Sequence, residues 1–338
     1  MRYVIGVDGG ATKTHALVVD DMGQALGFGS AGGSNQNVIG LEDALVEIGS
    51  AVNSALSDAQ LTGHNVAVGC FCLCGAALPE HFTTLQTSVE SLKRAKSVII
   101  KNDTFATLRA GLSRSWGIAL ICGTGFNGAG RAPDGSEARY AALGTWSGDW
   151  VGGGMLGEEI IRAVMRGYDG RGQPTVLNKL VLQALDVSDE QTLMVRLFRK
   201  EIRERAVTAL VPLLFEAALM GDEVARDLII RAGTDLGLSA NALIRRLSLQ
   251  DTDVEVVLGG SVFKGKGPLL LDTIREVIYQ LAPNAQLVRL KNEPVVGAAL
   301  LALEAAGVTI TPGISSQLDG SVRQLSAYPD SKSRETAN

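Results

Sequence analysis

The residues Tyr3 to Asp20, YVIGVDGGATKTHALVVD, decide the fold. The apolar run YVIGV is typical of a short buried strand, and the run HALVV that follows is typical of a second one. Gly9 and Gly10 lie between them and have no Cβ, so a phosphate can come close to the backbone N–H groups of a tight turn. A D-G-G turn also closes many plain hairpins, so this loop alone leaves a phosphate site and a simple hairpin open.

The other side chains of this loop suit a phosphate and its metal ion. Thr12 and Thr14 carry hydroxyl donors, and Lys13 carries a positive charge. Asp8 stands at the end of the strand, where a carboxylate can hold a hydrated Mg²⁺.

The same arrangement occurs again about 115 residues later. An apolar run from Trp116 to Cys122 is followed by GTGFNG at 123–128 and by a turn at 133–135. The distance from the loop to the turn glycine is 13 residues in the first copy (10 to 23) and 12 in the second (123 to 135). Two strand–loop–strand–turn segments predict a duplicated α/β domain.

The rest of the chain alternates strand and helix patterns, apart from a mostly helical stretch at 153–250. We therefore predict an N-terminal domain at 1–115 and a second domain at 116–306 that carries a helical insertion. Residues 307–338 are polar and lack periodicity, and we expect them to form a loose tail.

Composition narrows the function classes. The 338 residues carry a net charge of −5, which gives no electrostatic footprint for nucleic acid. No uncharged apolar stretch is long enough to span a membrane, and a strand pattern at the start leaves no room for a signal peptide. We expect a cytoplasmic protein with no nucleic acid or membrane partner.

Three of the four cysteines, Cys70, Cys72 and Cys74, alternate within one apolar run. The alternation is typical of a buried strand, whose successive residues face opposite sides. On that ground we expect that these thiols do not converge on a metal, and that all four cysteines are ordinary thiols in a reducing compartment.

Two glycine motifs resemble nucleotide signatures but fail in context. The segment 123–128 fits G-x-G-x-x-G, yet it leads into a strand and a turn, not into the helix that a dinucleotide fingerprint must open. The segment 260–267 has P-loop spacing, but Gly267 stands where the motif needs Ser or Thr.

A third glycine loop, Gly259-Gly260-Ser261, follows a late strand pattern. Together with DGGATKT and GTG it resembles, from about residue 3 to 306, the BadF/BadG/BcrA/BcrD-type ATPases of the sugar kinase/Hsp70/actin superfamily, especially their N-acetylglucosamine kinase branch. The resemblance implies two similar actin-like, ribonuclease H-like domains with a cleft between them, and Mg²⁺ at Asp8. It also implies an ATP site formed by Gly9, Gly10, Thr12, Lys13, Thr14, Gly123, Thr124, Gly259, Gly260 and Ser261.

The resemblance also implies a sugar site. It matches Asp103 to the catalytic base, which also binds the substrate, and the other substrate contacts to Asn35, Gly125, Asn127 and Asp149. From the residues alone, Asp103 ends a strand pattern and opens a helix, so a structural N-cap remains the alternative. The family reads Gly-Asp-Glu-Gly-Ser where this chain has GDWVG at 148–152, which puts the identity of the sugar in doubt.

The function we expect is ATP-dependent phosphorylation of an amino sugar, N-acetylglucosamine or glucosamine, with a small-molecule sugar as the partner. The alternative is an actin-like or regulatory ATPase of the same fold that phosphorylates no sugar. The two hypotheses share the phosphate loops and differ in the need for Asp103. A homodimer is left open by the sequence.

Overall fold

The computed structural model describes residues 1–325. Two compact units make up the chain. Unit 1 contains Met1–Ser115 together with the residues from Leu290 on, and unit 2 contains Trp116–Arg289. No helix among residues 1–325 is both long and apolar enough to cross a lipid bilayer.

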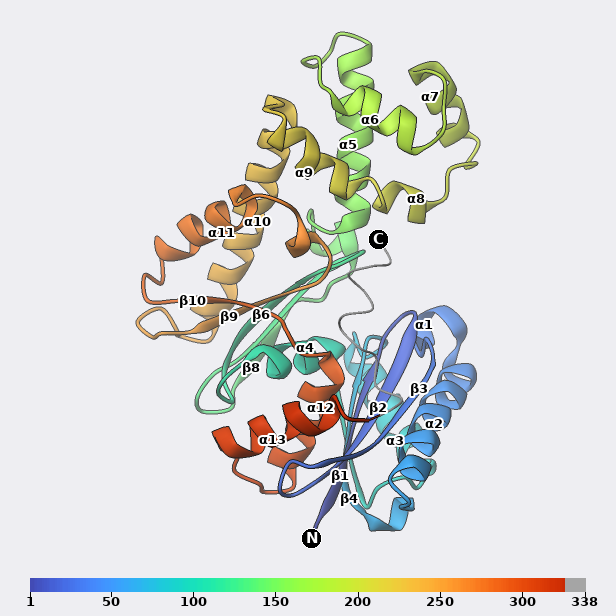
Figure 1. The fold of residues 1–338 in the computed structure, drawn as a ribbon, viewed down its shortest axis with the longest axis vertical. Coiled ribbons are helices and arrows are strands. Elements are labelled where there is room, and N and C mark those ends of the chain that lie inside the picture. The colour runs from blue at the N-terminus through green and yellow to red at the C-terminus, as the bar shows by residue number, and fades with distance from the viewer. Residues whose placement is uncertain (326–338) are drawn as a thin grey trace. The chain divides into compact units, whose positions relative to one another are not determined.

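Each unit is built on a five-stranded sheet (Figure 1). Unit 1 has the order β3-β2-β1-β4-β5, and its strands are β1 (Tyr3–Gly9), β2 (Lys13–Asp20), β3 (Ala25–Gly32), β4 (Val66–Leu73) and β5 (Ser97–Lys101). Unit 2 has the order β8-β7-β6-β9-β10, and its strands are β6 (Gly117–Cys122), β7 (Phe126–Arg131), β8 (Glu137–Arg139), β9 (Glu255–Gly259) and β10 (Gln286–Arg289).

The two sheets have the same topology. In each, the first three strands form an antiparallel meander, and the last two pair in parallel beside the first. The prediction of two similar α/β domains is therefore confirmed.

Helices cover both faces of the sheet in unit 1. Ile5 and Val7 face the hydrophobic core under α2 (Leu41–Asp58) and α3 (Pro79–Ser91). The opposite face packs against α12 (Pro294–Ala305), which also packs on α4 (Asp103–Gly111). The remaining helices of this unit are α1 (Gln36–Ile39) and α13 (Pro312–Val322).

Unit 2 carries its additional helices between β8 and β9, so the predicted helical insertion is confirmed. They are α5 (Gly153–Tyr168), α6 (Leu177–Ala184), α7 (Glu190–Phe198), α8 (Glu204–Thr208), α9 (Val211–Leu219) and α10 (Glu223–Arg246). Helix α11 (Leu269–Tyr279) connects β9 to β10 and packs along α10.

Two glycines let α12 lie against the backbone of its neighbours. A Cβ on Gly6 of β1 would stand 2.2 Å from the backbone nitrogen of Ala299, and one on Gly297 would stand 1.9 Å from the carbonyl oxygen of Ala106 in α4. No larger side chain fits at either position. The last apolar helix of the chain therefore packs in unit 1, whereas the sequence analysis had placed it with the second domain.

Two further expectations differ from the structure. Residues 312–322, expected in a loose tail, form α13, whose N-cap Thr311 accepts a hydrogen bond from the backbone N–H of Ile314.

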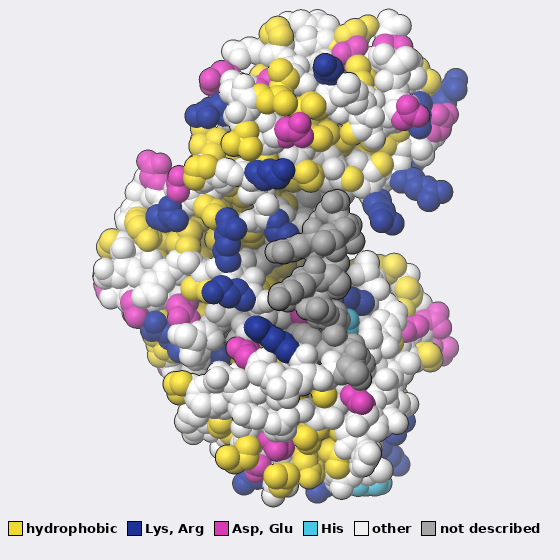
Figure 2. Space-filling model, viewed as in Figure 1, with side chains coloured by type: hydrophobic (Ala, Val, Ile, Leu, Met, Phe, Trp, Pro, Cys, Tyr) yellow, Lys and Arg dark blue, Asp and Glu magenta, His cyan; other side chains and the backbone are white. Residues whose placement is uncertain are grey.

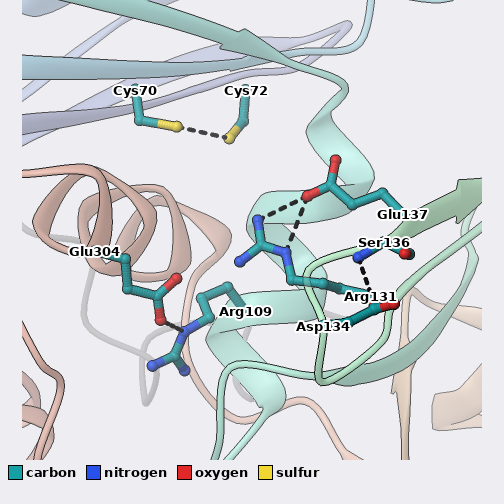
Figure 3. Close-up of polar contacts among 8 residues, drawn as sticks. All are labelled: Cys70, Cys72, Arg109, Arg131, Asp134, Ser136, Glu137 and Glu304. Atoms are coloured by element: carbon teal, nitrogen blue, oxygen red, sulfur yellow. Dashed lines mark hydrogen bonds and ion pairs between the residues drawn. The ribbon is translucent and has the colours of Figure 1, made fainter. Parts of the chain in front are cut away.

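The sulfur atoms of Cys70 and Cys72 lie 3.9 Å apart (Figure 3). The argument that the strand separates these thiols was wrong, because residues two apart on a strand share a face.

Candidate active site

Asp8 is a carboxylate of unit 1 whose pKa is strongly perturbed. It lies in β1 opposite Cys72 of β4, at the end of the strand. Its pKa is raised from 3.8 to about 7, first by burial and then by the charge of Asp103, against the opposing effect of Lys13. A cation beside Asp8 would stabilise the charged form of its carboxyl group, because the attraction would offset the cost of burial and the repulsion from neighbouring carboxylates.

Asp103 is the first residue of α4 and does not cap it. The cap is Asn102, whose backbone is extended and whose side-chain oxygen accepts from the N–H of Thr104 at 3.2 Å. Asn102 also donates to the carbonyl of Ala76 at 3.1 Å, so the start of α4 is fixed on both sides. The N-cap role, which the sequence analysis left as the alternative for Asp103, is therefore taken by Asn102.

Helix α4 is held in place by an ion pair to α12. Nε of Arg109 lies 2.7 Å from Oε1 of Glu304, and the Arg109 side chain is almost fully buried (Figure 3). Such a pair, combined with the close approach at Gly297, fixes the helix that presents Asp103.

The glycine loop of unit 1 forms the tight turn of the hairpin between β1 and β2. The N–H of Gly10 donates to the carbonyl of Lys13 at 2.9 Å, and a Cβ on Gly9 would stand 2.5 Å from the Leu73 side chain. Thr12 is exposed, whereas Thr14 is fully buried and its hydroxyl lies 2.7 Å from the carbonyl oxygen of Gly32. Thr14 therefore supports the loop from inside, and Thr12 is the hydroxyl that a ligand can reach.

Lys13 has a partner that sequence reasoning missed. Its Nζ lies 3.2 Å from Oε2 of Glu293, the residue that precedes α12. Glu293 also raises the pKa of Asp8, so the positive charge of Lys13 is shared between two acidic groups. No local pattern links positions 13 and 293, which are 280 residues apart.

The loop that follows β4 contacts the start of α1. Asn35 caps α1, and the side chain of Gln36 donates to the carbonyl of Gly75 at 3.2 Å. The adjacent Cys74 has its pKa raised to about 12, first by burial and then by the charges of Asp103 and Asp8. Cys74 therefore lines the same region as the predicted base, a position the sequence analysis did not assign.

In unit 2 the structure brings the two predicted nucleotide loops together. Gly260 has φ +107°, and a Cβ there would stand 2.3 Å from the carbonyl oxygen of Cys122, directly before Gly123. The carbonyls of Gly123 and Thr124 accept from the first N–H groups of α5, at 2.7 and 2.9 Å. A Cβ on Gly123 or Gly125 would meet no described atom within 4 Å, so this loop has open space beside it.

The predicted sugar contacts of unit 2 lie beside these loops. Asn127 is in β7, and its side-chain oxygen accepts from the N–H of Gly128 at 2.8 Å. Asp149 follows a 3₁₀ turn (Gly144–Ser147), and its Oδ2 accepts from the Ser147 hydroxyl at 2.7 Å. The half-buried Asp235 of α10 has its pKa raised by burial and, against the effect of Arg231, by Asp149.

The departure from the family motif at 148–152 has a structural partner. The guanidinium carbon of Arg231 lies 3.8 Å from the ring centre of Trp150, a cation–π contact between α10 and the segment that carries Asp149. The aromatic residue that replaces the family glutamate therefore anchors this segment to α10.

Among residues 1–325, no group of three or more His, Cys, Asp or Glu side chains could enclose a metal ion. Mg²⁺ does not need such a cage, since it commonly binds one or two carboxylates and takes its other ligands from water and phosphate. Asp8, with Asp103 nearby, fits that requirement.

Basic and acidic side chains both occur across the visible face (Figure 2).

Comparisons with known proteins identify relatives of the whole chain. The chain is 27% identical to the N-acetylmuramic acid/N-acetylglucosamine kinase of Clostridium acetobutylicum, over 89% of this chain and 98% of that protein. It is 29% identical to the N-acetyl-D-glucosamine kinase of Dictyostelium discoideum, over 88% and 97%. A solved structure from Chromobacterium violaceum, assigned as an N-acetylglucosamine kinase, shares the fold with TM-score 0.65 and 25% identity, covering 89% of this chain and 99% of that one.

The family model matches residues 5–302, which include all three glycine loops and both sheets except for the first two residues of β1. The chain belongs to the BadF/BadG/BcrA/BcrD ATPase family.

Proposed function

We propose that the protein transfers the terminal phosphate of ATP to a hydroxyl group of an amino sugar, N-acetylglucosamine or glucosamine. Family membership supports the use of ATP. Two curated relatives act on amino sugars according to their names, and this chain spans nearly their whole length.

The observation that carries the proposal is the arrangement at the start of α4. Asn102 caps the helix, so the carboxylate of Asp103 is not required there. A sugar hydroxyl is a poor nucleophile, and its proton must leave as the new phosphorus–oxygen bond forms. Asp103 accepts that proton and orients the hydroxyl oxygen, an effect worth roughly 10²–10⁴ in rate.

Asp8 and Lys13 act on the phosphates. Asp8 would hold Mg²⁺, and the ion would supply charge neutralisation at the phosphate oxygens. Lys13 supplies a second positive charge, and its ion pair with Glu293 keeps it in position before ATP arrives. Phosphoryl transfer needs mainly positioning and charge stabilisation, and these side chains supply both.

The remaining predicted contacts form two groups, one for the nucleotide and one for the sugar. Backbone N–H groups of the glycine loops, with Thr12 and Ser261, bind the nucleotide. The oxygen-bearing side chains of Asn35, Asn127 and Asp149, and the open backbone at Gly125, bind the sugar hydroxyls.

The test is ADP release measured with a panel of hexoses and amino sugars. We expect N-acetylglucosamine or glucosamine to stimulate turnover well above glucose. ADP release that does not depend on any sugar would instead indicate a regulatory ATPase of the same fold.

A further inference from the structure

Trp146 is an exposed aromatic side chain of unit 2. The chain has three tryptophans; Trp116 and Trp150 are partly buried, whereas Trp146 is 95% exposed. Leu143, three residues earlier, is 46% exposed. A large aromatic side chain kept in water loses the favourable burial that its ring would otherwise contribute.

The turn that carries Trp146 is firmly built although its tip is unpacked. The backbone N–H of Leu143 donates to the Ser147 hydroxyl at 2.7 Å, and that hydroxyl lies 2.7 Å from Oδ2 of Asp149. Gly144 and Gly148 have φ of +66° and +83°, values that glycine adopts without strain. Trp146 is thus presented by a turn whose own hydrogen bonds hold Asp149.

The side chains of this turn suit the hydroxyl groups of a sugar. Oδ2 of Asp149 lies 2.7 Å from the Ser147 hydroxyl, and a carboxylate held at the base of the turn can accept further hydrogen bonds from hydroxyl groups. A pyranose with equatorial hydroxyls has faces made of C–H bonds, which suit the negative face of an indole ring.

We propose that Trp146 forms an aromatic platform for the sugar, stacking on one face of the pyranose ring while Asp149 accepts from its hydroxyls. This inference rests on the proposed amino sugar kinase activity and assigns a specificity-determining residue to it. Trp150 does not compete for this role, because Arg231 already covers its ring.

Variants at position 146 test the platform by steady-state kinetics. Covering one indole face removes on the order of 60 Å² of apolar surface from water, which corresponds to about a tenfold change in affinity. We expect Trp146→Ala to raise KM for N-acetylglucosamine about tenfold, with kcat and the KM for ATP within about twofold of wild type. Trp146→Phe should recover most of the loss.

The matched control is Phe198→Ala, which removes another aromatic side chain of unit 2 that is 87% exposed and lies in α7. We expect it to change no kinetic constant. Wild-type sugar KM in Trp146→Ala, with turnover intact, would overturn the platform and leave the kinase proposal standing. If the wild-type protein turned over none of the amino sugars, that result would count against the kinase proposal itself.

Acrylamide quenching of tryptophan fluorescence tests the contact without turnover. N-acetylglucosamine should protect the wild-type protein from quenching, and Trp146→Phe should lose that protection. Protection by ATP alone would overturn the proposal in favour of a nucleotide contact. Protection that depends only on protein concentration would overturn it in favour of a contact between two copies of the chain.

Discussion

Asp8→Asn should make the protein more stable and less active. The pKa of Asp8 rises from 3.8 to about 7 on folding, so the folded protein must hold an unfavourable charge at pH 8. A shift of about 3 pH units corresponds to at most about 4 kcal/mol. Asp8 keeps partial contact with solvent, which lowers the expected gain to about 1–3 kcal/mol.

The number of protons bound by the folded and unfolded chains determines how the free energy of unfolding changes with pH. Well below pH 3.8 the carboxyl group is protonated in both the folded and the unfolded chain, so Asp8 contributes no difference. Between pH 4 and 7 the unfolded chain binds fewer protons than the folded one, and wild-type stability falls as pH rises. The advantage of Asp8→Asn over wild type should therefore grow from pH 4 to about pH 8 and then level off.

Thermal unfolding across this pH range measures the effect, at about 2–4 °C for each kcal/mol in a unit of this size. The control is Asp20→Asn in the same sheet, where Oδ1 accepts from the N–H groups of Met22 and Gln24 at 3.0 and 2.8 Å. That change keeps an acceptor oxygen but removes its negative charge, which weakens both bonds, so it should lower Tm without a gain that grows with pH. A Tm difference between Asp8→Asn and wild type that is the same at pH 5 and pH 8 would refute the reasoning.

Asp103→Asn should lower kcat at least about 100-fold in a coupled ADP assay, whereas a structural N-cap at this position would tolerate Asn with little change in kcat. Near-wild-type kcat at saturating substrates would place the base elsewhere. Gly297→Ala should destabilise the protein by about 2–3 kcal/mol or more in thermal unfolding, because its Cβ would meet the Ala106 carbonyl. Gly320→Ala in α13, where a Cβ would meet no described atom within 4 Å, should be neutral or stabilising. Turnover should stop in excess EDTA and return with Mg²⁺; full activity without Mg²⁺ would contradict the role of Asp8.

Features encoded within about twenty residues were predictable from the sequence. The strands around DGGATKT and GTGFNG, and the repeated distance from loop to turn, depend on local patterning and turn chemistry, and both meanders form as expected. Thr311 and Pro312 were a readable N-terminal signal for α13, but the polar composition of the tail obscured it.

The partners of individual side chains were not predictable. Asn102 and Asp103 are both good N-cap residues, and only the backbone geometry decides that Asn102 is the cap. The hydroxyl of Thr14 lies 2.8 Å from that of Ser34, twenty residues away, which no local pattern indicates. The roles of the predicted site residues remain predictions, and the kinetic tests above decide them.

The way α12 fits against Gly6 and Gly297 has a consequence for biosynthesis. The strand and the helix that meet there are made about 290 residues apart, a delay of roughly 15–60 s at about 5–20 residues per second. During that time β1 and α4 have emerged from the ribosome without the helix that covers them, while the uninterrupted chain of unit 2 can fold as it emerges. The apolar surface of unit 1 that α12 covers is thus exposed for most of translation, whereas the face under α2 and α3 can be covered early.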